Sequence, residues 1–218
     1  QNPLMTHLRK LASSRSYRKK SGEYLCDGTK LLAEALKWGA EVKTAVFSEG
    51  VDIPPLPDGV RAVRVSEELM HSVSPMETPQ GALFTVALPE LQLPETLSGK
   101  HYLVLDGVQD PGNVGTILRT ADAFDCDGIF LVNACADLYN PKTARATMGA
   151  IFRREAYTVT AGELFALLQK SGVPLYGTAL RDDTVPLAEA DLARAAVAIG
   201  SEGRGLSQQV LDECAKTL

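Results

Sequence analysis

No apolar run in the sequence reaches the roughly 18 residues that a membrane-spanning helix needs. The N-terminal segment is polar and basic and lacks the apolar core of a signal peptide, so we expect a cytoplasmic protein without membrane contact. With 45% hydrophobic and 22% charged residues, the 218-residue chain has the composition of a globular protein. Its length suits one large domain or two small ones.

Cysteine and histidine are few and scattered. The four cysteines contain no Cys-x-x-Cys pair, and the three histidines have no partners at the spacing of metal ligands. We therefore expect reduced thiols, no disulfide framework and no bound metal, as is usual for a cytosolic protein. None of the histidines is a candidate for catalysis.

Acidic residues are absent from residues 1–20, although the whole chain carries a net charge of −5. All charged residues of this segment are basic: Arg9, Lys10, Arg15, Arg18, Lys19 and Lys20. Such an asymmetry predicts a basic face that meets a polyanion such as RNA. A solvated basic helix end would produce the same pattern, so the charge run alone leaves both interpretations open. Tyr17 and Tyr24 have the chemistry to stack on a base, but core packing is the more frequent fate of a single tyrosine.

Helix-like and strand-like segments alternate through the first 88 residues. Apolar periodicity predicts helices over 3–12 and 29–38 and a helix start at Ser66. Short apolar runs predict strands over 23–26, 42–48, 60–65 and 81–87. Residues 88–99 contain two prolines and no clear pattern. We therefore expect a small α/β domain over 1–90, a linker over 91–99 and a second domain over 100–218.

Strand-like runs in the second domain are continuously apolar, as in HYLVL, GIFLV, PLYGTA and AVAIG. Continuous runs are typical of a parallel sheet that helices cover on both faces. Helical patterns over 113–125, over 163–171 and from about Leu206 alternate with them. The sequence therefore predicts an α/β fold with a mostly parallel sheet.

Three predicted strand ends carry polar residues and glycines, and ligands of open parallel sheets bind outside the carboxyl ends of strands. These segments are DGVQDPGNVG (106–115), GTALRDD (177–183) and IGSEGRGLS (199–207). None matches a Walker loop or a complete dinucleotide fingerprint, but a nucleoside-type ligand held by backbone groups fits them. Asp106 and Asp110 suit bracing or capping of the first loop, and Ser207 suits capping of the helix after the third.

Two of these stretches resemble, in the right order, the first two signature motifs of the SpoU/TrmH family of RNA ribose 2′-O-methyltransferases, which belongs to the SPOUT class. The stretches are NVGTILRTADAF (113–124) and IGSEGRGLS (199–207). Residues 140–153 are similar to the family's middle segment. Residues 2–28 and 74–86 resemble the L30e-like RNA-binding extension of many members. The resemblance implies S-adenosylmethionine as cofactor, ribosomal or transfer RNA as substrate, and a homodimer.

The resemblance also implies roles for individual residues. Asn113, Arg119 and Glu202 match the catalytic positions. Because a guanidinium stays protonated, we expect Arg119 to grip an RNA phosphate and stabilise the nascent alkoxide rather than act as a base. The expected cofactor contacts are Thr178, Ala179, Leu180, Gly200 and Gly203. The basic residues of the N-terminal segment are the expected RNA contacts.

Each role has a structural alternative. Arg119 has the pattern of a surface arginine, Asn113 that of a helix N-cap, and Glu202 that of a solvated loop acid. The glycines also suit turn geometry alone.

The family's third signature, an Ile-Pro-Met stretch and then a Ser-Leu-Asn segment, would begin where this sequence ends. We therefore expect the trefoil knot to be incomplete in this chain. A non-catalytic RNA-binding relative or a truncated fragment is the alternative function. A nucleotide-binding enzyme unrelated to RNA is a second alternative, against which the basic N-terminal segment speaks.

Overall fold

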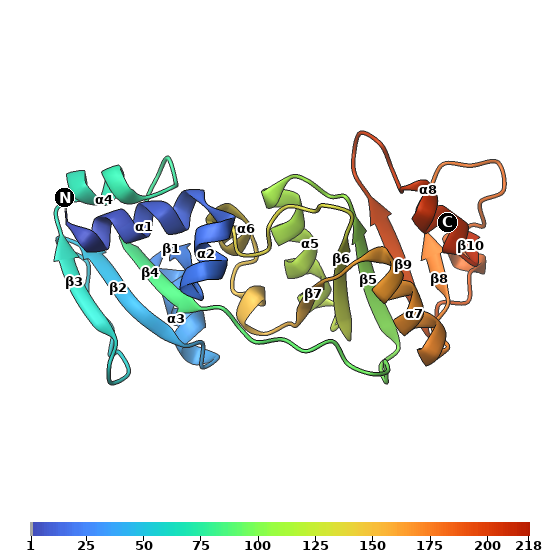
Figure 1. Cartoon of the computed structure of the whole chain (residues 1–218), viewed down its shortest axis with the longest axis horizontal. Helices are drawn as coiled ribbons and strands as arrows, with labels where there is room; N and C mark the ends of the chain where they lie inside the picture. The colour runs from blue at the N-terminus through green and yellow to red at the C-terminus, as the bar shows by residue number, and fades with distance from the viewer. Residues whose placement is uncertain (1) are drawn as a thin grey trace. The chain divides into compact units, whose positions relative to one another are not determined.

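The computed structural model describes residues 2–218, which form two compact units, each with its own sheet and core (Figure 1). The N-terminal unit contains the chain up to Glu90 together with Asp137–Arg153. The C-terminal unit contains Leu91–Ala136 and Arg154–Leu218. No helix among residues 2–218 is long and apolar enough to cross a membrane.

A four-stranded sheet organises the N-terminal unit, in the order β1-β4-β2-β3. Its strands are β1 (Glu23–Asp27), β2 (Val42–Ser48), β3 (Arg61–Val65) and β4 (Ala82–Ala87). Strand β4 pairs antiparallel with β1 and β2, and β3 pairs parallel with β2. The four strands follow the sequence prediction to within one residue at each end.

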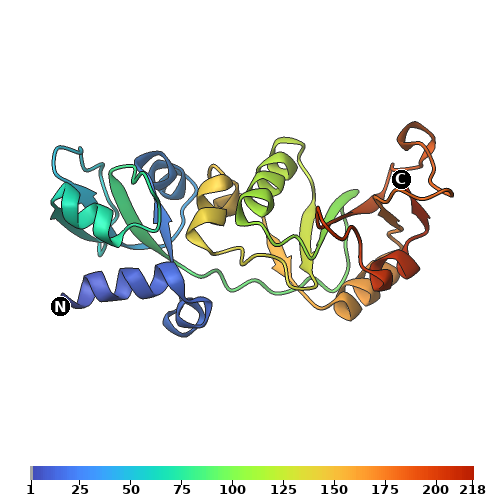
Figure 2. The same ribbon diagram turned by 90° about the horizontal axis from the view of Figure 1, so that it is seen from above.

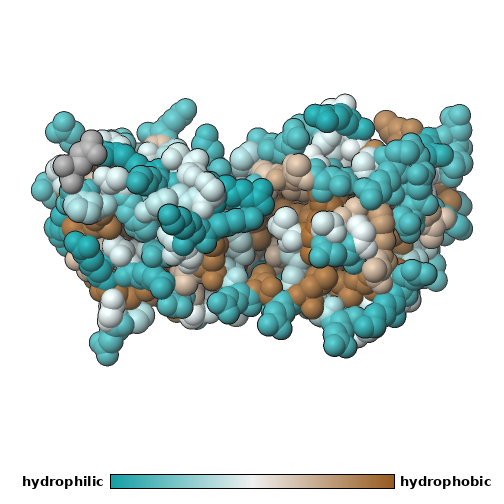
Figure 3. Space-filling model, viewed as in Figure 1, coloured by the Kyte–Doolittle hydropathy of each residue, from teal (hydrophilic) through white to brown (hydrophobic). Residues whose placement is uncertain are grey.

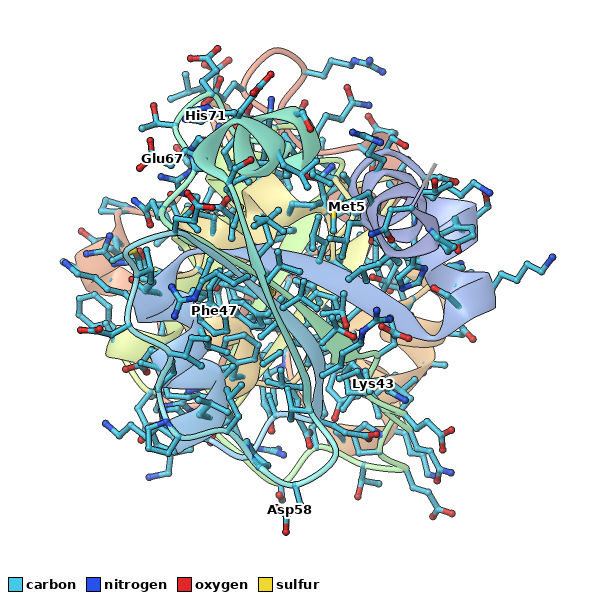
Figure 4. All side chains as sticks on the ribbon, turned by 90° about the vertical axis from the view of Figure 1, so that its left-hand side faces the viewer. Met5, Lys43, Phe47, Asp58, Glu67 and His71 are labelled. Atoms are coloured by element: carbon cyan, nitrogen blue, oxygen red, sulfur yellow. The ribbon has the colours of Figure 1, made fainter. Side chains whose placement is uncertain are left out.

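Helices cover both faces of this sheet. They are α1 (Pro3–Ser13), α2 (Arg15–Ser21), α3 (Thr29–Lys37), α4 (Glu67–Val73) and α6 (Pro141–Ala146), with a 3-10 turn at Ala150–Phe152. Figure 2 shows α1 and α3 on opposite sides of the sheet. Figure 4 shows Met5 of α1 turned toward the sheet and Phe47 inside the unit, while Glu67 and His71 of α4 lie at the surface.

Local sequence explains where these helices begin. Asn2 accepts a hydrogen bond from the backbone N–H of Leu4, and Pro3 occupies the first helical position of α1, where its missing N–H costs nothing. Ser66 caps α4 by accepting from Leu69, as the sequence predicts. The short helix α2, capped by Ser14, has no apolar period and was not predicted.

Residues 137–153 depart from the expected domain division, because they pack with the N-terminal unit. Tyr139 lies against Tyr24 with ring centroids 4.9 Å apart, and Ala144 is fully buried in the same core. Arg18 of α2 forms a 2.6 Å ion pair with Asp137. A segment that the sequence places inside the second domain therefore completes the core of the first.

The C-terminal unit has a six-stranded, wholly parallel sheet in the order β10-β8-β9-β5-β6-β7. The strands are β5 (His101–Asp106), β6 (Gly128–Val132), β7 (Ala156–Thr158), β8 (Leu175–Gly177), β9 (Ala195–Gly200) and β10 (Lys216–Thr217). The predicted parallel α/β fold is therefore confirmed. Strand β8 is shorter than its apolar run, and β10 was not predicted.

Helices lie on both faces of the parallel sheet. Helix α5 (Pro111–Ala123) lies on one side, and α7 (Ala161–Ser171) and α8 (Gln208–Glu213) lie on the other (Figure 2). Chain connections from β5 lead toward β6 and β7, whereas those from β9 lead toward β10 at the opposite edge. The neighbouring strands β5 and β9 therefore flank the topological switch point, where doubly wound sheets bind ligands.

Candidate functional site

Two loops meet at the switch point. Asp106 ends β5 and Gly200 ends β9, and the two residues are partners in the parallel ladder. Asp110 caps α5 by accepting a 2.8 Å hydrogen bond from the N–H of Asn113. Asn113 is therefore on the first turn and is not the N-cap. Its Nδ2 is left to donate a 2.6 Å hydrogen bond to Oε1 of Glu202.

The loop after β9 closes on itself. Ser201 and Gly205 form a bridge with N–H to carbonyl distances of 3.2 and 2.8 Å. A Cβ on Gly200 would lie 2.1 Å from the carbonyl carbon of Gly205, so residue 200 must be glycine. A Cβ on Gly203 would meet open space. The requirement at Gly200 thus comes from the loop's own backbone.

A buried carboxylate joins the same loop to a third strand end. Asp106 is 2% exposed and accepts hydrogen bonds from the N–H of Ser207 at 2.6 Å and from Nδ2 of Asn133 at 2.7 Å. Asn133 follows β6 and has a φ of 55°, which asparagine tolerates better than most residues. Asp106 therefore braces the ends of β5, β6 and β9, the structural role that the sequence predicts for it.

Adjoining pockets surround the loop at 200–207. The first, of about 390 Å³, is lined by Asn113, Gly200, Glu202 and Gly203 among others. The second, of about 640 Å³, is lined by residues from the ends of β8 and β10 and from α8, including Thr178, Ala179 and Leu180. The expected cofactor contacts are therefore divided between two pockets, and Glu202 and Arg204 line both.

The larger pocket suits S-adenosylmethionine in size and chemistry, since small-molecule sites typically measure about 300–1,000 Å³ and are largely apolar. Leu180, Leu206 and Leu211 offer apolar surface for an adenine ring. Glu202 and Arg204 offer opposite charges to the ammonium and carboxylate of an amino acid. The hydroxyl of Thr178 already donates to the carbonyl of Ala198, so this side chain stabilises the strand end.

Arg119 lies apart from these pockets. It is exposed on α5, about 120° around the helix from Asn113 at 3.6 residues per turn. Within residues 2–218 it makes no hydrogen bond or ion pair, so neither Asn113 nor Glu202 orients it. The structure therefore brings together two of the three expected catalytic residues.

The basic segment of the N-terminal unit has one buried member. Arg18 is 3% exposed, pairs with Asp137 and donates to the carbonyl of Leu11 at 2.6 Å. Its guanidinium is thus a structural group, which corrects the expectation that it contacts RNA. The other five residues are exposed: Arg9, Lys10, Arg15, Lys19 and Lys20. Figure 3 shows mainly hydrophilic surface over α1 and α2.

Two thiols near the site are poor nucleophiles. Burial raises the pKa of Cys135, whose sulfur donates to the carbonyl of Leu105 at 3.2 Å. Burial also raises the pKa of Cys214 to about 11. A nucleophilic cysteine needs a lowered pKa, so these thiols do not suit covalent catalysis. No group of acidic, histidine or cysteine residues able to hold a metal occurs within residues 2–218.

Sequence reasoning missed Asn133 and Arg204. In the sequence, Asn133 is one polar residue among several in a loop. Its role depends on hydrogen bonds to Asp106 and Ser207, which are 27 and 74 positions away. Arg204 lies inside the glycine-rich stretch and lines both pockets, and within residues 2–218 its guanidinium makes no hydrogen bond. An arginine between two glycines was the available signal, since it combines charge with a backbone that can approach a ligand closely.

Comparison with known proteins gives matches for both units. Residues 100–218, more than half of the chain, match the SpoU rRNA Methylase family. Residues 2–83 match the MRM3-like substrate binding domain. The chain is 33% identical over 198 residues to the 23S rRNA (guanosine(2553)-2′-O)-methyltransferase RlmP of Bacillus subtilis, covering 90% of this chain and 78% of that protein.

Solved structures agree with these matches. The AdoMet-bound rRNA methyltransferase from Sinorhizobium meliloti superposes with a TM-score of 0.85 at 27% identity, covering 99% of this chain and 84% of that one. The SpoU methyltransferase AviRb from Streptomyces viridochromogenes superposes with a TM-score of 0.88 over 100% of this chain and 88% of that one. At 22% identity, the second likeness bears on the fold alone.

Proposed function

The chain belongs to the SpoU rRNA Methylase family, and from this membership we propose that it methylates a ribose 2′-hydroxyl of ribosomal RNA with S-adenosylmethionine as methyl donor. The observation that carries the proposal is the 2.6 Å hydrogen bond between Asn113 and Glu202, because it joins the two signature loops beside a pocket of cofactor size. RlmP, whose name states the same reaction on 23S rRNA, supports ribosomal over transfer RNA.

In this proposal the protein's part in the reaction is mainly positioning. Bound S-adenosylmethionine supplies an activated methyl group. Glu202 and Arg204 hold its charged end, and the apolar side of the larger pocket holds the adenine. Asn113 keeps the glycine-rich loop against the first turn of α5, and this fixed arrangement would hold a bound ribose in place beside the cofactor pocket. No covalent intermediate with the protein is required.

Arg119 is the group that we assign to the RNA phosphate and the developing negative charge on the ribose oxygen. Because Arg119 lines neither pocket of its own chain, we assign it to the pocket of a second copy of the chain. Arg119 and Thr120 are exposed on α5, and Phe124 just after the helix is 79% exposed. We therefore propose a homodimer in which α5 lies at the interface. We also propose that the protein acts in the cytoplasm.

Methyl transfer tests the function directly. The protein is incubated with S-adenosylmethionine labelled in its methyl group and with unmodified ribosomal RNA, and the RNA is digested to nucleosides. We expect label in a 2′-O-methylnucleoside. Label on a base, or label only in transfer RNA supplied in parallel, would contradict the proposal.

Mixing of variants tests the placement of Arg119. Arg119→Ala and Glu202→Ala are each expected to lose most of their activity. After subunit exchange, a two-fold dimer with one intact composite site should restore up to about a quarter of the wild-type activity. If mixing restores nothing while a tag on one variant recovers both variants together, Arg119 does not act on the partner's pocket.

A further inference from the structure

We propose that a pocket beside Trp38, within the N-terminal unit, binds one unpaired nucleobase of the RNA substrate. The proposal rests on the proposed function, since it names part of the substrate that the methyltransferase holds. The pocket measures about 600 Å³ and lies far in the chain from the signature loops. Its lining includes Tyr24, Trp38, Lys43 and the 3-10 turn at Ile151 and Phe152.

Trp38 is a fixed aromatic surface. It is the only tryptophan of the sequence and follows α3, with 49% of its surface exposed. Its Nε1 donates to Oε2 of Glu34 at 3.3 Å, and the same carboxylate accepts from Arg153 at 2.6 Å. The guanidinium carbon of Arg153 and Nζ of Lys37 each lie 5.7 Å from the indole centroid. A half-exposed indole whose orientation is held in this way is suited to stacking rather than to filling a core.

Tyr24 supplies a second, independent observation. It is 2% exposed and lines the same pocket. Its hydroxyl makes no hydrogen bond with any of residues 2–218, and burial raises its pKa, so the group is a neutral donor. Among residues 2–218 the hydroxyl oxygen is not one of the side-chain atoms that are sealed from solvent without a partner, so it is open to water in the pocket. A keto or ring-nitrogen acceptor of a base is the kind of group that would satisfy it.

The charges around the pocket suit a base rather than a phosphate. Three basic residues, Lys37, Lys43 and Arg153, are balanced by three acids, Glu34, Glu41 and Glu90. Lys43, which Figure 4 shows at the outside of the unit, lies 3.5 Å from Glu41. A neutral, partly apolar pocket with one aromatic wall is typical of recognition of splayed RNA bases.

The exposed lysines at the end of α2, next to the pocket, are suited to bind the phosphates of the same RNA strand. Gly22 lines the pocket and directly follows α2, whose last turn carries Lys19 and Lys20. At about 3.8 Å per residue, the Cα of Lys20 is at most about 8 Å from that of Gly22. A single strand that places a base against Trp38 would therefore present its backbone to the exposed lysines of α2.

The single tryptophan makes the proposal directly measurable. Trp38 fluorescence is followed during titration with a ten-nucleotide single-stranded oligoadenylate and with the ribosomal RNA substrate, and binding is measured independently by anisotropy of end-labelled RNA. We expect saturable quenching with the same midpoint as the anisotropy change. RNA binding without any change in Trp38 fluorescence would overturn the proposal, as would quenching by an apolar peptide but by neither RNA.

Variants separate stacking from folding. Because one stacked base contributes about 1–3 kcal/mol, Trp38→Ala should weaken RNA binding about 5- to 150-fold. Trp38→Phe keeps an aromatic face and should lose much less, and Tyr24→Phe tests the hydroxyl without removing the ring. In methyl transfer we expect Trp38→Ala to raise KM with kcat unchanged. Equal RNA affinity for Trp38→Ala and the wild type would refute the site.

The proposal and the proposed function fail in different ways. Quenching and the affinity loss of Trp38→Ala remain measurable if no methyl transfer is detected, and then only the reaction is wrong. Methyl transfer that is insensitive to Trp38→Ala at limiting RNA leaves the reaction in place and removes the base site.

Discussion

Asn113 and Glu202 lie 89 positions apart in the sequence, yet Nδ2 of Asn113 donates a 2.6 Å hydrogen bond to the carboxylate of Glu202. The bond joins the loops that follow the neighbouring strands β5 and β9. Both residues are exposed enough to meet a ligand, so the pair combines bracing with a possible direct contact.

Asn113→Ala should lower kcat/KM about 10- to 150-fold, because a hydrogen bond to a charged group contributes about 1.5–3 kcal/mol. Glu202→Gln is expected to cost less, since its amide oxygen still accepts. The double variant Asn113→Ala/Glu202→Ala shows whether the residues act as one unit, in which case its loss is smaller than the sum of the single losses. Strictly additive free energies would mean that the bond does not matter to the reaction.

Gly200 and Gly203 form a matched pair of glycines in one loop. Gly200→Ala places a Cβ 2.1 Å from the backbone of Gly205, whereas a Cβ at Gly203 meets open space. We therefore expect Gly200→Ala to weaken S-adenosylmethionine binding more than about tenfold and Gly203→Ala less than about threefold, as measured by calorimetry. Similar affinities for the two variants would show that the loop relaxes freely around residue 200.

Asp106→Asn should loosen three strand ends at once. The amide can accept only one of the bonds now given by Ser207 and Asn133, so one partly exposed donor loses its partner, at a cost of about 1 kcal/mol. Hydrogen exchange of the β5 and β9 amides should accelerate. Asp110→Asn is the control, because asparagine caps a helix as well as aspartate and should leave exchange unchanged.

Much of this architecture was predictable from local patterns. The strand at 42–48 and the cap at Ser66 follow from apolar runs and from side chains that bond their own neighbours. Helix α2 was missed because six of its seven residues are polar or basic and give no apolar period; its helicity depends on packing against the unit. The assignment of residues 137–153 to the first unit depends on contacts with residues more than 100 positions away, which local patterns do not encode.

The candidate site was predictable in composition but not in geometry. The two signature stretches place Asn113 and Glu202 correctly, and parallel topology explains why they meet. Charge alone did not separate Arg18 from Lys19, although one is buried and the other exposed. Nor did the motif show that Arg119 lines neither of the two pockets, since that depends on the rotation of α5.

Arg18 and Lys20 should therefore respond differently to truncation. Arg18→Ala leaves Asp137 without its main partner, and breaking a mostly buried pair costs about 3–5 kcal/mol of stability. Lys20→Ala should change stability by less than about 0.5 kcal/mol but lower the slope of log affinity against log salt by about 0.7–0.9 if it holds one phosphate. Urea unfolding followed by Trp38 fluorescence reports the first effect, and RNA titration at several salt concentrations reports the second. An unchanged salt slope in Lys20→Ala would exclude Lys20 as a phosphate contact.

Asp27 gives the N-terminal unit a predictable pH dependence. Its carboxyl is fully buried, and burial raises its pKa from 3.8, although hydrogen bonds from Ser74 and Gln80 and the charge of Arg145 partly oppose the shift. Between 3.8 and the raised value, the folded unit keeps a proton that the unfolded chain has lost. Stability from this group therefore falls as pH rises through that window and is constant above it.

Asp27→Asn removes this titration while keeping the shape of the side chain. The difference in unfolding free energy, variant minus wild type, should be smallest near the ordinary aspartate pKa of about 3.9 and below, and should grow toward neutral pH. Urea unfolding followed by Trp38 fluorescence at steps from about pH 3.5 to 7.5 measures it within the same unit. Asp58→Asn, at the exposed loop labelled in Figure 4, controls for the loss of one surface carboxylate. A difference that shrinks as pH rises would reverse the sign and mean that the bonds from Ser74, Gln80 and Arg145 outweigh burial.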